Sequence, residues 1–143
     1  MQACGKESNQ IDSKSRAIAA AAASLEKKAA DVVILELAGL TAIADYFVIC
    51  SAENIQQVKA IVAQIEESLR KLGIRPIRME GLQHAHWVLM DYGDLIVHVF
   101  EADTRAFYEL EKFWLDAPRI PFHDEDTANL GRQDQRAGAG RAH

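Results

Sequence analysis

Histidines and carboxylates that could bind a metal ion lie close together in the second half of the sequence. His84 and His86 are two residues apart, so an extended chain would point both imidazoles to one side. Side chains that could complete a metal shell follow, namely Asp91, Asp94, His98 and Glu101. A competing interpretation is that Asp91 and Asp94 flank a turn. His98 would then be a buried histidine with one hydrogen bond, because strand alternation places it with Ile96 and Phe100. We favour this second interpretation and expect no metal site.

Other signatures of catalysis are missing from the sequence. Its two cysteines, Cys4 and Cys50, offer neither a disulfide framework nor a paired C-x-x-C zinc motif. Cys50 ends an apolar run, which is typical of a core thiol rather than of a nucleophile beside a base. The phosphate-binding patterns G-x-x-x-x-G-K-S/T and G-x-G-x-x-G do not occur. We therefore expect no cofactor and no catalytic centre.

The size and composition indicate one globular domain. The chain has 143 residues, of which 49% are hydrophobic and 26% charged. Apolar runs such as residues 17–23 are far shorter than the roughly 20 residues that span a bilayer. Residues 1–14 are polar and lack the apolar run of a signal peptide, so we expect a cytoplasmic protein. We expect a flexible segment at 1–12, a domain at 13–122 and a disordered tail at 123–143, because the tail has almost no large apolar residue.

Hydrophobic periodicity predicts elements in the order α-β-β-α-β-β-β-α. Helices are expected at 13–30, 54–73 and 104–114, and strands at 32–37, 46–50, 75–79, 87–91 and 95–100. Asn54 is a helix cap with Gln57 in the place of a capping-box partner. Gly93 allows a tight hairpin turn, and Pro76 favours an edge position for its strand. The last helix is expected to place four side chains on one face, namely Phe107, Leu110, Glu111 and Trp114. This order predicts an α/β fold with a mixed five-stranded sheet flanked by helices.

The charge distribution is uneven. The formal net charge is −5, a sign that repels phosphate backbones unless the bases gather into a patch. Residues 80–117 contain eight acids and two bases, whereas residues 54–79 contain five bases and two acids. An RNA-binding helix around Lys59, Arg70 and Lys71 is disfavoured, because no aromatic side chain is interleaved for base stacking.

The acidic third of the sequence has two interpretations. It is either a solvated mixed surface or one face of a binding surface for a basic protein. Trp87, Tyr92 and Trp114 favour the second interpretation, because aromatic anchors beside complementary charge are typical of protein interfaces. Trp87 and Trp114 can also be explained as core residues. Tyr92, expected in the turn itself, is the hardest of the three to explain by packing.

Six short segments of the sequence, taken together and in this order, form a distinctive pattern. They are DYFVICS at 45–51, QV at 57–58, EG at 80–81, WVLMDYGD at 87–94, VHVF at 97–100 and FYELEKFW at 107–114. Together they resemble the ribosomal silencing factor family, also called RsfS or Iojap-like. The resemblance extends from about residue 18 to residue 120 and covers nearly all of the expected domain.

The resemblance implies a non-enzymatic translation regulator with a nucleotidyltransferase-like fold. It implies binding to the large ribosomal subunit through large-subunit protein fourteen, a steric block of subunit joining when nutrients are short, and a homodimer in the free state. Ribosomal RNA would be contacted only at the margin. The family pattern places partner binding on Trp87, Asp91, Tyr92, Gly93, Asp94 and His98, with Glu80, Glu101, Arg105 and Tyr108 as weaker candidates. The alternative is a nucleotide- or metal-dependent enzyme on the same type of sheet.

Overall fold

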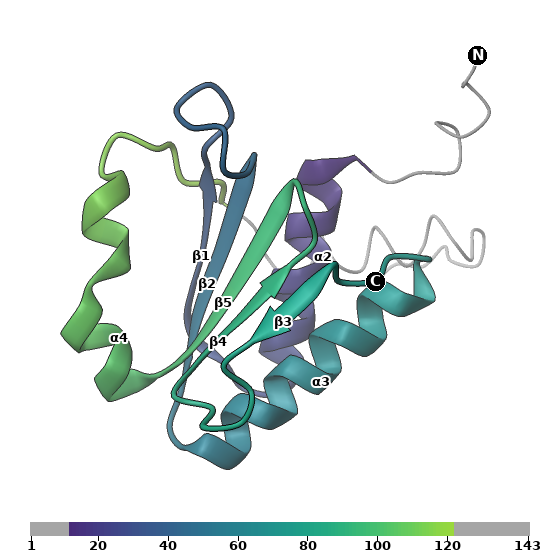
Figure 1. Cartoon of the computed structure of the whole chain (residues 1–143), viewed down its shortest axis with the longest axis vertical. Coiled ribbons are helices and arrows are strands. Elements are labelled where there is room, and N and C mark those ends of the chain that lie inside the picture. Colours follow the sequence, from purple (N-terminus) through teal and green to yellow (C-terminus); the bar gives the residue numbers. More distant parts are fainter. Residues whose placement is uncertain (1–11, 122–143) are drawn as a thin grey trace.

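The sheet and its helices form three layers, as the computed structural model of residues 12–121 shows (Figure 1). The strands are β1 (Ala30–Glu36), β2 (Tyr46–Ala52), β3 (Arg78–Glu80), β4 (Trp87–Asp91) and β5 (Leu95–Glu101). They form a five-stranded sheet in the order β1-β2-β5-β4-β3. The β2–β5 pair is parallel, and the other three pairs are antiparallel. The predicted α/β fold with a mixed five-stranded sheet is confirmed.

Helices cover both faces of the sheet. Helices α2 (Ser13–Glu26) and α3 (Ile55–Lys71) lie on one face, and α4 (Ala102–Tyr108) with the 3-10 helix η1 (Leu110–Trp114) lies on the other (Figure 1). Among residues 12–121 there is no helix with the length and apolar character needed to span a bilayer.

The start of α3 confirms the predicted cap. Asn54 Oδ1 accepts a hydrogen bond from the backbone N–H of Gln57 at 2.8 Å. The Gln57 side chain in turn accepts from the backbone N–H of Glu53 and donates to the carbonyls of Lys27 and Lys28. This amide therefore joins the first turn of α3 to the loop after α2, in addition to satisfying the free donors of the helix end.

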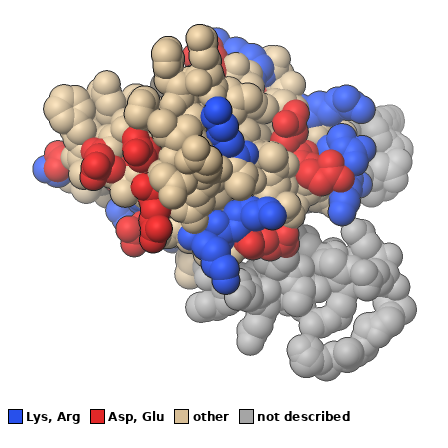
Figure 2. All heavy atoms as spheres, turned by 90° about the horizontal axis from the view of Figure 1, so that it is seen from below, with Lys and Arg blue, Asp and Glu red and all other residues tan. Residues whose placement is uncertain are grey.

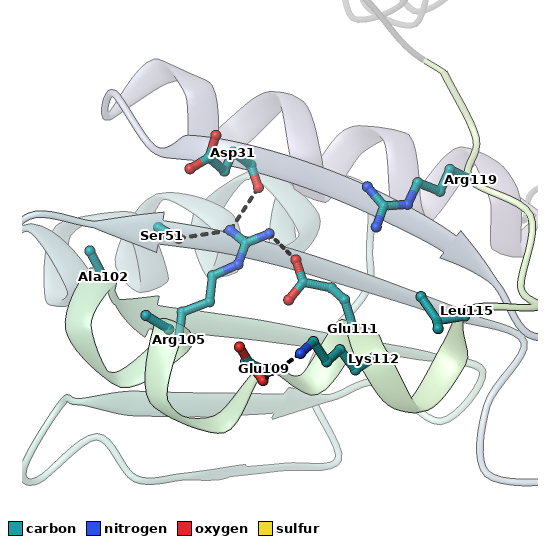
Figure 3. A pocket seen from close by; sticks show the side chains of 10 residues that line it. Asp31, Ser51, Ala102, Arg105, Glu109, Glu111, Lys112, Leu115 and Arg119 are labelled. Carbon is teal, nitrogen blue, oxygen red and sulfur yellow. Dashed lines mark hydrogen bonds and ion pairs between the residues drawn. The ribbon is translucent and has the colours of Figure 1, made fainter.

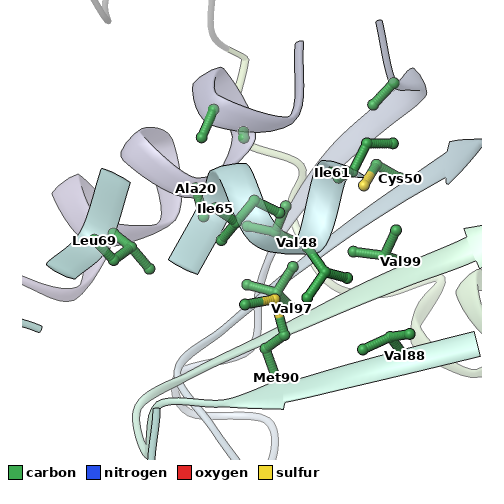
Figure 4. Close-up of a cluster of buried hydrophobic side chains, with 14 of the residues drawn as sticks. Ala20, Val48, Cys50, Ile61, Ile65, Leu69, Val88, Met90, Val97 and Val99 are labelled. Carbon is green, nitrogen blue, oxygen red and sulfur yellow. The ribbon is translucent and has the colours of Figure 1, made fainter. Parts of the chain in front are cut away.

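The larger hydrophobic core lies between the sheet and helices α2 and α3 (Figure 4). Helix α3 contributes Ile61, Ile65 and Leu69, and α2 contributes alanines such as Ala20, whose small side chains allow close packing. Cys50 of β2 is fully buried here, and burial raises the pKa of its thiol to about 12. The prediction of a core thiol is confirmed.

Helix α2 and strand β3 differ from their predicted ranges. Helix α2 ends at Glu26 rather than at residue 30, because the chain turns left-handed at Lys28 with φ +68°. The Ala29 N–H then bonds back to the carbonyl of Ser24, which closes the helix end. Strand β3 is short and begins at residue 78, but its predicted edge position is confirmed.

The last predicted helix is broken into two pieces. Helix α4 ends at Tyr108, Glu109 adopts a left-handed conformation with φ +48°, and η1 begins at Leu110. The break turns Leu110 and Trp114 onto the second, smaller core, where the Trp114 ring meets Phe47 of β2. The prediction that Phe107 shares their packed face is wrong: Phe107 is 78% exposed.

Candidate functional site

Alternation along β4 divides its side chains between the two faces of the sheet. Val88 and Met90 enter the core under α2 and α3, whereas Trp87, Leu89 and Asp91 point to the side of α4. Residues paired across neighbouring strands point the same way, and Asp91 and Leu89 lie opposite two residues of β3, namely Arg78 and Glu80. These five side chains therefore share one side of the sheet.

Helix α4 packs mainly on β5 and β2 and leaves this part of the sheet only partly covered, since Trp87, Leu89 and Asp91 are half-buried while Arg78 and Glu80 are exposed. We call the resulting surface the open face. It consists of Arg78, Glu80, Trp87, Leu89 and Asp91 of the sheet, together with Phe107 and Tyr108 of α4.

A chain of aromatic contacts joins the open face to the protein interior. The Trp87 indole stacks on Phe100, with ring centroids 4.8 Å apart, and its centroid lies 5.1 Å from that of Tyr108. Tyr108 meets Phe107 edge to face at 5.0 Å. Phe100 is fully buried, whereas Tyr108 is 49% exposed. The exposed rings are thus supported from behind by rings of the core, which limits their motion and leaves apolar area for a partner.

Carboxylates border the aromatic part of the open face. The Arg78 guanidinium lies 2.7 Å from the Glu80 carboxylate and 3.1 Å from that of Asp91. The side chains of Arg78 and Glu80 are more than half exposed, so these ion pairs add little to folding stability. Glu80 is therefore free to exchange this contact for one with a basic partner, whereas the Asp91 side chain is only 17% exposed. Asp91 also accepts from the Gly93 N–H and so shapes the hairpin turn.

Two predicted residues of the hairpin turn do not lie on the open face. Tyr92 is 5% exposed and packs in the core beside α3, and burial, assisted by the charge of Glu66, raises the pKa of its hydroxyl. The expectation that Tyr92 is the hardest of the three aromatic residues to explain by packing is wrong, because it is a core residue. Asp94 binds the Arg16 guanidinium at 3.1 Å and accepts a hydrogen bond from Ser13, both on α2. Asp94 therefore holds the start of α2 against the hairpin.

Two further predicted residues occupy the end of β5 and α4. Glu101 pairs with His86 at 2.6 Å. Arg105 turns toward β1 and β2, where it donates to the Asp31 carbonyl and to Ser51 Oγ, each at 2.7 Å (Figure 3). Its other terminal nitrogen binds Glu111. The guanidinium thereby anchors α4 to the sheet and bridges the break before η1.

A cavity of about 420 Å³ lies beside Arg105. Two ion pairs lie in its lining, since Arg105 binds Glu111 and Lys112 binds Glu109, whereas the charged groups of Asp31 and Arg119 make no ion pair among the described residues (Figure 3). Burial alone would raise the pKa of Glu111, but its hydrogen bond with Arg105 and the charge of that guanidinium outweigh this, so the pKa is lowered. The Arg105–Glu111 pair at this cavity is a structural junction, because it joins α4 and η1 to each other and to the sheet.

The possible metal ligands are bound to different partners. His86 pairs with Glu101, while Asp91 and Asp94 pair with different arginines. His98 is 4% exposed and accepts a hydrogen bond from Trp87, as expected for a buried histidine with one hydrogen bond. In the part of the chain that the structure describes, no group of three His, Cys, Asp or Glu could hold a metal ion.

Charge is mixed over the surface, with a local excess of acids. Figure 2 shows more Asp and Glu than Lys and Arg on the α4 side, whereas Lys and Arg lie beside further Asp and Glu in the middle and on the α3 side. Among the acids of residues 80–117, Glu80 and Asp91 lie on the open face and Asp103, Glu109 and Glu111 lie in or between α4 and η1, whereas Asp94 faces α2.

The sequence pattern of one protein family, described as ribosomal silencing factor during starvation, matches residues 10–143. This chain belongs to the ribosomal silencing factor family. The match continues past the expected domain boundary at residue 122, into a segment outside the described residues. The Bacillus subtilis ribosomal silencing factor RsfS is 46% identical over 99 residues, which are 69% of this chain and 84% of the relative.

Two solved structures confirm the fold of this family member. A protein from Bacillus halodurans has a TM-score of 0.64 and 41% identity, and the alignment covers 72% of this chain and 93% of that one. A protein from Chromobacterium violaceum has a TM-score of 0.72 and 26% identity, with 78% and 92% covered.

Three large apolar side chains near α4 and η1 are exposed, and the sequence analysis did not predict their exposure. Phe107, Phe113 and Leu115 are each more than 70% exposed. A signal for them was present: six of the nine residues 107–115 are large and apolar. That is more than one helix face can bury, since an amphipathic helix buries about three or four residues per two turns. Some of them therefore had to remain on the surface.

Proposed function

We propose that this protein binds the large ribosomal subunit through large-subunit protein fourteen and sterically blocks joining of the small subunit. It thereby represses translation in the cytoplasm when nutrients are short. The open face is the observation that carries the proposal: it presents Tyr108 and Phe107 beside the carboxylates of Glu80 and Asp91. Membership of the ribosomal silencing factor family supports the same function.

The chemistry of the open face suits a basic protein. Aromatic side chains contribute apolar contact area, and the carboxylates steer and orient a positively charged partner. The net charge of −5 disfavours bare RNA, so ribosomal RNA is contacted only at the margin. The mechanism needs no catalytic group or cofactor, because the protein acts by occupying space that the small subunit requires.

We also propose that the free protein is a homodimer. Phe113 and Leu115, at 74% and 77% exposure, are large apolar side chains that self-association would cover. Light scattering on the purified protein should give twice the chain mass of 15.9 kDa. Phe113→Ala should shift this mass toward that of one chain.

The main test is subunit joining followed by sucrose-gradient sedimentation. Large and small subunits are mixed with and without the protein, and co-sedimentation with large subunits alone measures affinity. Tyr108→Ala should weaken binding roughly thirtyfold, as expected for loss of about 2 kcal/mol at an interface aromatic. Ile43→Ala is the matched control, because Ile43 is similarly exposed, at 58%, but lies in the β1–β2 connection, by the opposite edge of the sheet.

Two outcomes would contradict the proposal in different ways. Complete subunit joining in saturating excess of the wild-type protein would exclude the steric block. Equal affinities of Tyr108→Ala and Ile43→Ala for large subunits would place the binding surface away from the open face.

A further inference from the structure

His98 lies beneath the open face rather than on it. It occupies the middle of β5, directly opposite Leu89 of β4 and Ile49 of β2. The Phe47 ring lies 4.6 Å away, centroid to centroid, in an edge arrangement. With 4% of its surface exposed, His98 offers a partner almost no area for direct contact.

The imidazole makes one polar contact among the described residues. Trp87 Nε1 donates to His98 Nδ1 at 3.1 Å, while His98 Nε2 is buried without a partner. Because Nδ1 accepts, the neutral ring carries its proton on Nε2. Burial lowers the pKa of His98 to about 4, so the ring is neutral, and able to accept at Nδ1, at pH 7. An apolar ring of similar size could fill this position, but it could not accept from the indole.

Trp87 connects this buried acceptor with the exposed aromatic side chains. The indole is only partly buried, and it contacts Phe100 on the inner side and Tyr108 on the outer side. Stacking alone tolerates small changes in the χ1 and χ2 angles of the indole, whereas a directional hydrogen bond from Nε1 restricts both angles. The orientation of Trp87 sets the position in which Tyr108, and then Phe107, can pack.

We propose that His98 is a positioning residue for ribosome binding, and that it acts through the indole of Trp87 without touching the partner. This inference rests on the proposed function. The hydrogen bond holds Trp87 in one orientation, and Trp87 holds Tyr108 and Phe107 ready for docking. Binding then orders few side chains, which increases affinity.

The test compares His98→Phe and His98→Asn in affinity for purified large subunits. His98→Phe keeps an aromatic ring but removes the acceptor, whereas His98→Asn places an amide oxygen near the position of Nδ1. His98→Phe should bind about tenfold more weakly, and His98→Asn should recover most of this loss. Thermal unfolding establishes that each variant is folded at the temperature of the binding measurement.

Two readouts separate positioning from a purely structural role. The Trp87 indole N–H signal in NMR, assigned with Trp114→Phe, should exchange with solvent at least tenfold faster in His98→Phe than in the wild type. In a Trp87→Phe background, His98→Phe should change affinity for large subunits by less than about twofold. The indole N–H through which His98 is proposed to act is absent from that background.

Wild-type affinity of folded His98→Phe would overturn the inference, as would a tenfold loss that persists in the Trp87→Phe background. Failure of the proposed function has a different signature: the wild-type protein itself would not bind large subunits. In that case the positioning role fails with it.

Discussion

Acidification from pH 7 to pH 5 is expected to destabilise the protein through His98. Burial lowers the pKa of this imidazole from 6.5 to about 4, and no charged neighbour contributes to the shift. In the unfolded chain the pKa returns to its ordinary value. Between these two values the unfolded chain binds a proton that the folded chain does not. The free energy of unfolding therefore falls as the pH falls.

The magnitude follows from the two pKa values. With 6.5 in the unfolded and about 4 in the folded state, proton linkage removes about 2 kcal/mol between pH 7 and pH 5. This is a large part of the roughly 5–15 kcal/mol that stabilises a typical domain. The pKa values of Asp12 and Glu111 are lowered by their hydrogen-bond partners, so these carboxyls lose their stabilising effect at lower pH, mostly below this window.

Urea denaturation of the wild type and of His98→Phe at several pH values measures this effect. The variant retains every other titrating group, so the difference between the two pH profiles isolates His98. We expect the wild type to lose about 2 kcal/mol more than the variant between pH 7 and pH 5. Parallel profiles, within about 0.5 kcal/mol, would refute the reasoning, because the imidazole would then be as well solvated in the folded state as in the unfolded chain.

Three substitutions, at Gly81, Arg105 and Ile65, test the packing by chemical denaturation, and Gly73→Ala and Lys112→Ala are controls for the first two. An added Cβ at Gly81 would lie 2.2 Å from a backbone oxygen of β4, so Gly81→Ala should cost about 3 kcal/mol. Gly73→Ala, with a similar positive φ but open space, should cost about 1 kcal/mol. Arg105→Ala removes three hydrogen bonds of a side chain that is 11% exposed and should cost about 2–3 kcal/mol, whereas the exposed Lys112→Ala should cost less than about 0.5 kcal/mol. Ile65→Ala, in the core, should cost about 2–5 kcal/mol.

Local sequence patterns were sufficient to predict most strands of the sheet and helix α3. The cap at Asn54 with the periodic sequence after it predicts a helix, and the two apolar runs around Gly93 predict a hairpin. Both predictions rest on neighbouring residues alone, and both are confirmed by α3 and the β4–β5 pair. The break at Glu109 could not be predicted in this way. It depends on contacts with distant residues, since Arg105 binds β1 and β2 while Trp114 meets Phe47.

The misplacement of Tyr92 has a different cause, because the necessary signal was in the sequence. Alternation from Val88 through Met90 continues to Tyr92, which places all three on the side of α2 and α3. The prediction assumed instead that a residue beside a turn is exposed. The same alternation, applied from Trp87, correctly separates the side chains of the open face from those of the core.

The break after α4 explains why this short segment can both cover a core and present a binding surface. A single continuous helix over this segment could bury only the apolar side chains that lie on one of its faces. The left-handed Glu109 rotates η1 relative to α4, so Trp114 closes the smaller core while Phe107 remains outside. Arg105 holds the two pieces together through Glu111. The geometry of the proposed docking surface therefore depends on one backbone conformation, which is stabilised by the contacts of Arg105 with β1 and β2.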